Sequence, residues 1–163
     1  MKKTIIVCLL ALCCSLCLPC TTWAQNKVFE KYSEMENGNV EYICITRSML
    51  KLMGAGSSIS KKISVNGVNI TGLSDAIKVL IIINSGDKKV CQQMAKDFKT
   101  LKADPNYELL MMVRDDFDKV STLFNNTGKD KELVMYIDDS IDQTFIVLTG
   151  QLDEEMVNKL LSK

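Results

Sequence analysis

Four apolar segments follow one another closely in the last third of the chain, and they constrain the fold more than any other feature. The stretches between them are rich in residues that favour turns: DDFD at 115–118, NNTG at 125–128 and DDSID at 138–142. Connections this short favour antiparallel neighbours. The sequence therefore predicts a C-terminal four-stranded meander, with strands at residues 107–114, 119–124, 131–138 and 143–150.

A nearly continuous apolar run, AIKVLIII at residues 76–83, precedes these segments. Such a run is typical of a central strand that is buried on both faces of a sheet. Gly86 and Asp87 break the run, and a helix is predicted from there to Asp104-Pro105. Its apolar residues recur at helical spacing: Val90, Met94, Phe98 and Leu101.

The remaining patterns predict short elements around this centre. They are helices at 28–36, 47–53 and 154–161, a strand at 40–46, and a short strand near 63–65 within a long loop. Helices cluster early and strands late, which favours an α+β fold. We expect a single domain with a largely antiparallel sheet, a C-terminal four-stranded meander and helices packed on one face.

The N-terminus has the pattern of a secretory signal peptide. Lys2 and Lys3 are followed by an uncharged run over residues 4–18, and small side chains stand at Thr22 and Ala24. This pattern predicts a signal peptide at residues 1–24, cleavage between Ala24 and Gln25, and a mature domain at residues 25–163. We therefore expect an exported protein, periplasmic or secreted.

A lipid anchor is the alternative reading of the same stretch, because five of the seven cysteines lie before residue 21. Neither Cys17 nor Cys20 is preceded by residues that fit lipid attachment well, so an outer-membrane lipoprotein is not favoured. The apolar run is also shorter than the roughly 20 residues that a membrane-spanning helix needs. No transmembrane segment is expected in the mature chain.

The composition excludes several classes of function. The chain has no histidine, so histidine-based nucleophilic catalysis and zinc motifs of the HExxH kind are ruled out. The mature chain would keep only Cys44 and Cys91, too few for a thiolate metal centre. It would carry 18 basic and 20 acidic residues, a net charge of about −2, which gives no footprint for nucleic acid. We expect no catalytic residue, no metal and no cofactor.

Three groups of residues remain as candidate sites. Cys44 and Cys91 are a candidate disulfide in an oxidising compartment, or else two small buried hydrophobes. Ser140, within Asp139-Ser140-Ile141, resembles an acceptor for O-glycosylation in exported bacterial proteins. Aspartates at 115, 116, 118, 138, 139 and 142 suit turns better than a calcium loop, because the D-x-D-x-D-G spacing is missing.

Several ordered motifs resemble one family of exported bacterial proteins, the domain of unknown function 4252. They are VEYI at 40–43 followed by RSMLKLM at 47–53, YELLM at 107–111, KELVM at 131–135, and LTGQL at 148–152. The likeness extends over residues 28–160, although Cys44 and Thr46-Arg47 stand where the family often has a serine-lysine pair. The resemblance implies a protein of Gram-negative bacteria without established catalytic residues, similar to proteins encoded beside extracytoplasmic sigma-factor systems.

These observations lead to three functional expectations. The first is a non-enzymatic envelope accessory protein that binds another envelope protein through a face or an edge of its sheet. The alternative is a carrier of a small ligand or lipid, with a pocket between helices and sheet. The third is an enzyme that uses a carboxylate together with Arg114 or Tyr107.

Overall fold

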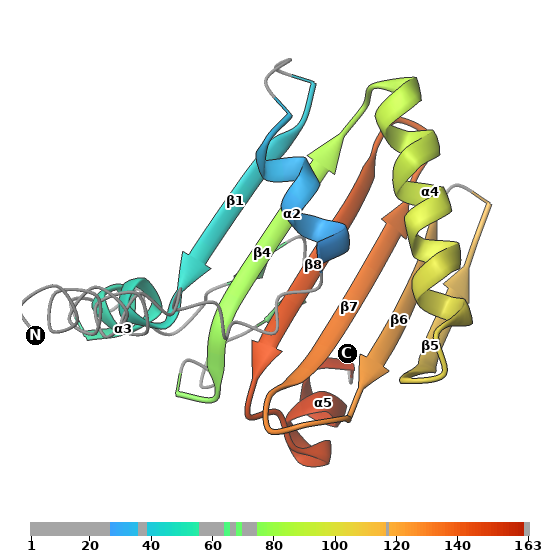
Figure 1. Cartoon of the computed structure of the whole chain (residues 1–163). Helices are drawn as coiled ribbons and strands as arrows, with labels where there is room; N and C mark the ends of the chain where they lie inside the picture. Colours follow the sequence, from blue (N-terminus) through green and yellow to red (C-terminus); the bar gives the residue numbers. More distant parts are fainter. Residues whose placement is uncertain are drawn as a thin grey trace, which may run out of the picture.

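The computed structural model describes residues 27–35, 39–55, 64–65, 68–69, 75–116 and 118–161. The signal peptide predicted at residues 1–24 and its cleavage point between Ala24 and Gln25 lie outside these residues. The centre of the molecule is a six-stranded antiparallel sheet (Figure 1). In spatial order its strands are β1 (Glu41–Thr46), β4 (Ile77–Ser85), β8 (Gln143–Gly150), β7 (Lys131–Asp138), β6 (Lys119–Asn125) and β5 (Tyr107–Arg114).

The predicted meander is confirmed. Strands β5, β6, β7 and β8 pair in chain order through three antiparallel ladders. The last of them, β8, also pairs with β4 along almost its whole length, from Ile77 opposite Gly150 to Ser85 opposite Gln143. This second pairing joins the N-terminal strands β1 and β4 to the meander. The α+β class and the largely antiparallel sheet are therefore also confirmed.

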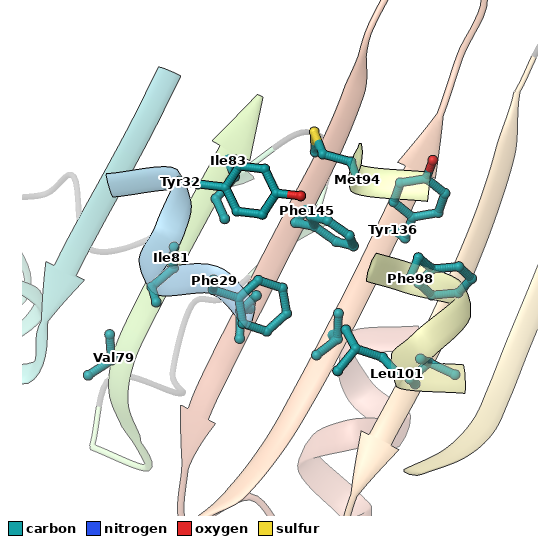
Figure 2. Close-up of a cluster of buried hydrophobic side chains, with 13 residues drawn as sticks. Phe29, Tyr32, Val79, Ile81, Ile83, Met94, Phe98, Leu101, Tyr136 and Phe145 are labelled. Atoms are coloured by element: carbon teal, nitrogen blue, oxygen red, sulfur yellow. The ribbon is translucent and has the colours of Figure 1, made fainter. Parts of the chain in front are cut away.

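Two helices lie across one face of the sheet, α2 (Lys27–Ser33) and α4 (Lys88–Ala103) (Figure 1). An aromatic cluster fills the space between these helices and the strands (Figure 2). The Phe98 ring stacks on Tyr136 with 4.6 Å between centroids, and the Phe29 ring meets Phe145 edge-on at 5.4 Å. Such pairs stabilise a core beyond the area they bury. Ile81 and Ile83 of β4 complete the cluster beneath α2.

The opposite face carries a second, mainly aliphatic cluster. Val157 and Leu160 of α5 (Glu154–Leu161) and Leu50 of α3 (Arg47–Ala55) pack there against the central strands. The structure thus corrects one detail of the prediction, because helices lie on both faces of the sheet and not on one. The reason is in the strands: residues 133–136 of β7 and 145–148 of β8 are buried on alternating faces, so both faces need cover.

The ends of α4 follow ordinary capping rules. The Asp87 side chain accepts hydrogen bonds from the backbone N–H groups of Lys89 and Val90, which the helix itself leaves without partners. At the other end, the Asp104 backbone N–H donates to the Leu101 carbonyl. Gly86 and Asp87 therefore separate β4 from α4 as the sequence predicts.

A small hairpin outside the main sheet pairs β2 (Ser64–Val65) with β3 (Val68–Asn69). The sequence predicts the first of these strands and not the second. Among the described residues, no helix is both long and apolar enough to cross a membrane.

Candidate functional site

The outer strand β5 exposes a row of large apolar side chains. Not one of its eight residues is buried, although six of them are apolar or aromatic. The exposed fractions are 39% for Leu109, 36% for Leu110, 44% for Met112 and 51% for Val113. β5 ends the sheet, so its outward N–H and C=O groups have no neighbouring strand among the described residues (Figure 1). We call Tyr107–Arg114 the β5 edge.

A β-bulge interrupts this edge in its middle. Leu109 pairs with Leu123 and Met111 with Thr122, so Leu110 is an extra residue without a cross-strand partner. Bulges bend and twist an edge strand and restrict what can pair with it. The two ends of the β5 edge carry opposite charges, Glu108 near its start and Arg114 at its end. The edge is thus apolar in its centre and carries opposite charges near its two ends.

Two acidic turns lie close to the Arg114 end of the β5 edge. Asp115 and Asp118 in the β5–β6 turn and Asp139 in the β7–β8 turn line a common shallow recess. The Asp115 side chain accepts from the Asp118 N–H at 2.7 Å, and Asp139 accepts from the N–H groups of Ile141 and Asp142. These bonds to backbone N–H groups hold the pKa of the Asp139 carboxyl below its usual range.

The two acidic groups are therefore turn-forming residues, as the sequence favours. Their carboxylates satisfy the backbone of their own loops, which is the usual reason for aspartate in hairpin turns. No group of three or more histidine, cysteine or carboxylate side chains within the described ranges is arranged to hold a metal ion.

An open hollow of about 500 Å³ lies at the start of α4. Met35, Val40 and Val90 form its apolar lining, and Asn39 and Lys89 are among its polar residues. The Asn39 side-chain amide donates to the Asp87 carboxylate at 3.3 Å. This hollow lies beside the helix start, whereas the sequence analysis placed a ligand pocket between helices and sheet. That space is filled by the aromatic cluster (Figure 2).

One buried carboxylate joins α2 to α4. Asp97 is 7% exposed and accepts hydrogen bonds from the Tyr32 hydroxyl at 2.5 Å and the Gln93 amide at 2.8 Å. The Lys31 ammonium lies 2.5 Å from the same carboxylate. Burial, together with the neighbouring Asp97, raises the pKa of the Tyr32 hydroxyl. Because every oxygen of Asp97 has a partner, this cluster holds two helices together and leaves no free general base.

The two residues proposed as alternatives for an enzyme, Tyr107 and Arg114, each lie near a carboxylate. Tyr107 donates a hydrogen bond to Glu132, which is buried. Arg114 lies at the other end of the same strand, seven residues away, or about 23 Å at the rise of a β-strand. Tyr107 and Arg114 therefore belong to separate places on the strand, and catalysis by a carboxylate with either of them stays a prediction.

Cys44 and Cys91 are both free thiols in the structure. Cys44 is exposed on β1 opposite Ile81, whereas the Cys91 thiol donates to the Ser85 carbonyl at 3.1 Å. Four residues of β4 separate those two contacts, about 13 Å along the strand. A disulfide needs Cα atoms within about 7 Å, and pairing of Cys44 with Cys91 stays a prediction. Desolvation is the main cause that raises the pKa of each thiol.

Ser140 lies in the exposed turn between β7 and β8. Its neighbour Ile141 is 82% exposed, the largest value among the exposed apolar side chains of the described residues. The Asp139-Ser140-Ile141 motif is therefore open to a modifying enzyme, and O-glycosylation of Ser140 stays a prediction. An intact mass of the protein from its native host would test it.

The exposed apolar surface of β5 is not evident from the sequence. YELLMMVR has six apolar or aromatic residues in eight and no clear alternation, so its composition predicts a buried strand. The only hint of an outer position is the pair of charges, Glu108 and Arg114, near its ends. The bulge at Leu110 has no signature in the sequence, because it carries neither glycine nor proline.

Comparison with known proteins identifies the family to which the chain belongs. No curated protein and no solved structure gives a significant match. The sequence profile of the family described as Domain of unknown function (DUF4252) matches residues 32–160, which span β1 to β8 and nearly all of α5. On the extent of this match, the chain belongs to the DUF4252 family.

Proposed function

We propose that the protein is a non-enzymatic, exported accessory protein of the cell envelope that binds another envelope protein. The partner would add an extended segment to the β5 edge as a further strand of the sheet. The observation that carries this proposal is that an outer strand exposes four apolar side chains, in two adjacent pairs: Leu109 and Leu110, and Met112 and Val113.

Strand addition suits this edge for physical reasons. Main-chain N–H and C=O groups on an outer strand supply affinity to any extended segment, and side chains on the two faces select its sequence. Natural proteins usually protect such edges with charges along the strand, whereas the β5 edge has charged residues only near its ends. A segment with a basic residue near Glu108 and an acidic residue near Arg114 would fit its polarity.

The location and the signalling role rest on the sequence. The signal-peptide pattern of residues 1–24 supports export, and the family resemblance supports a link to extracytoplasmic sigma-factor signalling. Partner binding at the β5 edge and export are separable, because either one can fail in an experiment while the other holds.

Strand addition can be tested by site-specific photo-crosslinking from position 112 in envelopes of the native host. We expect one partner of fixed stoichiometry by native mass spectrometry, and its binding should protect the backbone amides of β5 from hydrogen exchange. The double variant Met112→Lys, Val113→Lys should lose the partner. The control Ile141→Lys changes a more exposed apolar residue in the β7–β8 turn, off the strand, and should retain the partner.

Two results would overturn strand addition at this edge. One is a stoichiometric complex that survives the double lysine variant. The other is a complex in which protection from exchange falls on elements other than β5.

The hollow at the start of α4 supports a second candidate function, the binding of a small ligand. A volume of about 500 Å³ lies within the range of small-molecule sites, and its lining combines apolar residues with Asn39 and lysines 88 and 89. Native mass spectrometry of freshly purified protein should then show a bound compound of defined mass. Val90→Trp would fill the hollow and should remove that compound while the β5 edge still captures its partner.

A further inference from the structure

The hydrogen bonds of the β5–β6 hairpin determine which backbone groups of the β5 edge point away from the sheet. In the turn, the Asp115 N–H donates to the Asp118 carbonyl at 3.0 Å, which makes these two residues a hydrogen-bonded pair. Hydrogen-bonded and non-hydrogen-bonded pairs alternate along an antiparallel ladder, so Val113 turns its backbone groups toward β6. Met112 and Arg114 therefore direct their N–H and C=O groups outward, where an added strand would bind them.

The side chains at this end of the β5 edge alternate between the two faces of the sheet. Met112 stands opposite Ser121 of β6, and Ser121 stands opposite Tyr136 of the aromatic cluster. Residues two apart on a strand share a face, so Met112 and Arg114 both lie on the face of the aromatic cluster. Val113 lies on the opposite face, which carries the aliphatic cluster. An added strand would therefore meet a charged and an apolar side chain on one face and apolar side chains on the other.

Arg114 ends a row of charged side chains that runs across three strands. Its neighbour across the ladder is Lys119, and like charges directly opposite each other are unfavourable. Lys119 has the acidic Asp138 of β7 on its other side. Neither Arg114 nor Lys119 forms an ion pair with any of the described residues. An acidic side chain on the outer side of Arg114 would complete the row, with the two basic residues between two acidic ones.

We infer that the β5 edge binds an extended segment in which an acidic residue is followed by three apolar residues, aligned antiparallel with residues 111–114. The acidic residue would lie opposite Arg114, and the apolar residues would lie opposite the three residues before it. This inference rests on the proposed addition of a strand to the β5 edge, and it specifies the chemistry of the segment that is added.

The direction and the short length of this segment follow from the sheet. Every neighbouring pair of strands in the main sheet is antiparallel, and parallel pairing is slightly less stable per residue. The bulge at Leu110 interrupts the regular alternation of the strand. A regular incoming strand therefore matches the β5 edge only from Met111 to Arg114.

The acidic turn beyond Arg114 restricts the residue that precedes the acidic one in the segment. In an antiparallel alignment that residue would lie opposite Asp115, which lines the shallow recess together with Asp116 and Asp118. A second acidic residue at this position would be repelled, whereas a basic residue would be attracted. The expected core of the segment is therefore a basic residue, an acidic residue and then three apolar residues.

Two labelled peptides that differ only at the acidic position, with the cores KEVLV and KKVLV, test this chemistry on the purified protein. Fluorescence anisotropy should show that KEVLV binds about fivefold more tightly, because an opposite-charge pair with Arg114 replaces a repulsive one. Arg114→Glu should reverse the preference between the peptides, which a folding defect would not do. The control Lys51→Glu makes the same change of charge on an exposed side chain of α3, beside β1, and should leave the preference unchanged (Figure 1).

Amide hydrogen exchange tests the register without any change of charge. Saturating KEVLV should slow the exchange of the Met112 and Arg114 N–H groups, whereas Val113 should change little because its N–H already bonds to β6. Equal affinity for the two peptides, no measurable binding of either at millimolar concentration, or protection of Val113 alone would each overturn the inference. Capture of the native partner from position 112 is measured separately. A captured partner together with indifferent peptides would refute the motif and leave strand addition intact.

Discussion

Strands β8 and β5 have eight residues each, and β5 contains more apolar side chains, yet the two strands are buried to very different extents. In β8, QTFIVLTG, seven residues are buried, whereas in β5, YELLMMVR, none is buried. β8 has a strand on each side and clusters on both faces, while β5 has a neighbour on one side only. The position of a strand in the sheet, more than its hydrophobicity, decides whether its side chains stabilise the fold.

From this contrast we expect the apolar residues of β8 and of β5 to have different roles. Side chains of β8 should contribute mainly to the free energy of unfolding, and side chains of β5 mainly to recognition. Substitutions of similar size in the two strands should therefore give effects of very different magnitude on different measurements.

The largest effect is expected in the centre of β8. Phe145 is fully buried and contacts the rings of Phe29, Tyr32 and Tyr136. Phe145→Ala should lower the free energy of unfolding by about 3–5 kcal/mol, measured by urea denaturation. Met112→Ala on β5 is the matched truncation of an exposed side chain, and a comparable loss there would break the contrast between the strands.

A smaller effect is expected between the helices that cover β8. Tyr32→Phe removes the hydroxyl that donates to the buried Asp97, and it should cost about 1.5–3 kcal/mol because the acceptor is charged. Tyr136→Phe is the control in the same aromatic cluster, since its buried hydroxyl has no hydrogen-bond partner among the described residues. That control should be neutral or slightly stabilising. Equal losses in both variants would show that removal of a buried hydroxyl, and not loss of the hydrogen bond to Asp97, lowers the free energy of unfolding.

The β7–β8 turn should show a modest and pH-dependent effect. Asp139 has a lowered pKa in the folded protein, so it stabilises the fold above the pKa of an unfolded aspartate and loses this contribution as the pH falls. Asp139→Ala should cost about 1 kcal/mol at pH 7. The difference from the native protein should shrink in urea titrations at acidic pH. Asp116→Ala in the neighbouring turn serves as control, and a pH-independent difference for Asp139 would refute the explanation.

The smallest effect on stability is expected on β5. Val113→Lys should change the free energy of unfolding by no more than about 0.5 kcal/mol, because the side chain already lies at the surface. The same substitution should weaken capture of the partner protein. A clear loss of stability with unchanged capture would reverse the assignment of β5 to recognition.

Local patterns predicted most of the secondary structure. The predicted strands at 131–138 and 143–150 have the observed bounds, and the helix predicted at 154–161 agrees with α5. The apolar run at 76–83 is indeed a central strand buried on both faces, extended by two residues to Ser85. These elements are set by spacing and by turn residues, which act over a few positions of the chain.

Long-range arrangement could not be predicted in the same way. Nothing local indicates that β8 inserts between β4 and β7, or that α3 and α5 cover the face opposite α2 and α4. The exposure of the β5 edge could not be predicted for the same reason, since an apolar residue looks the same in the sequence whether it lies in the core or at the surface. The hydrogen bond between Tyr32 and Asp97 joins residues 65 positions apart, and no local sequence pattern predicts a contact over that separation.

The pairing of β4 with β8 also determines the order in which the sheet is completed. β4 is synthesised long before β8. Ser85 pairs with Gln143 and Ile77 with Gly150, so these pairs cannot form until β8 has been made. Closing a loop of this length is slow compared with forming the hairpins of the meander. The strand IKVLIIINS can therefore pair only with β1 until residues 143–150 are available. Until then this strand presents an unpaired apolar edge, which is the kind of surface that favours aggregation of incompletely folded chains.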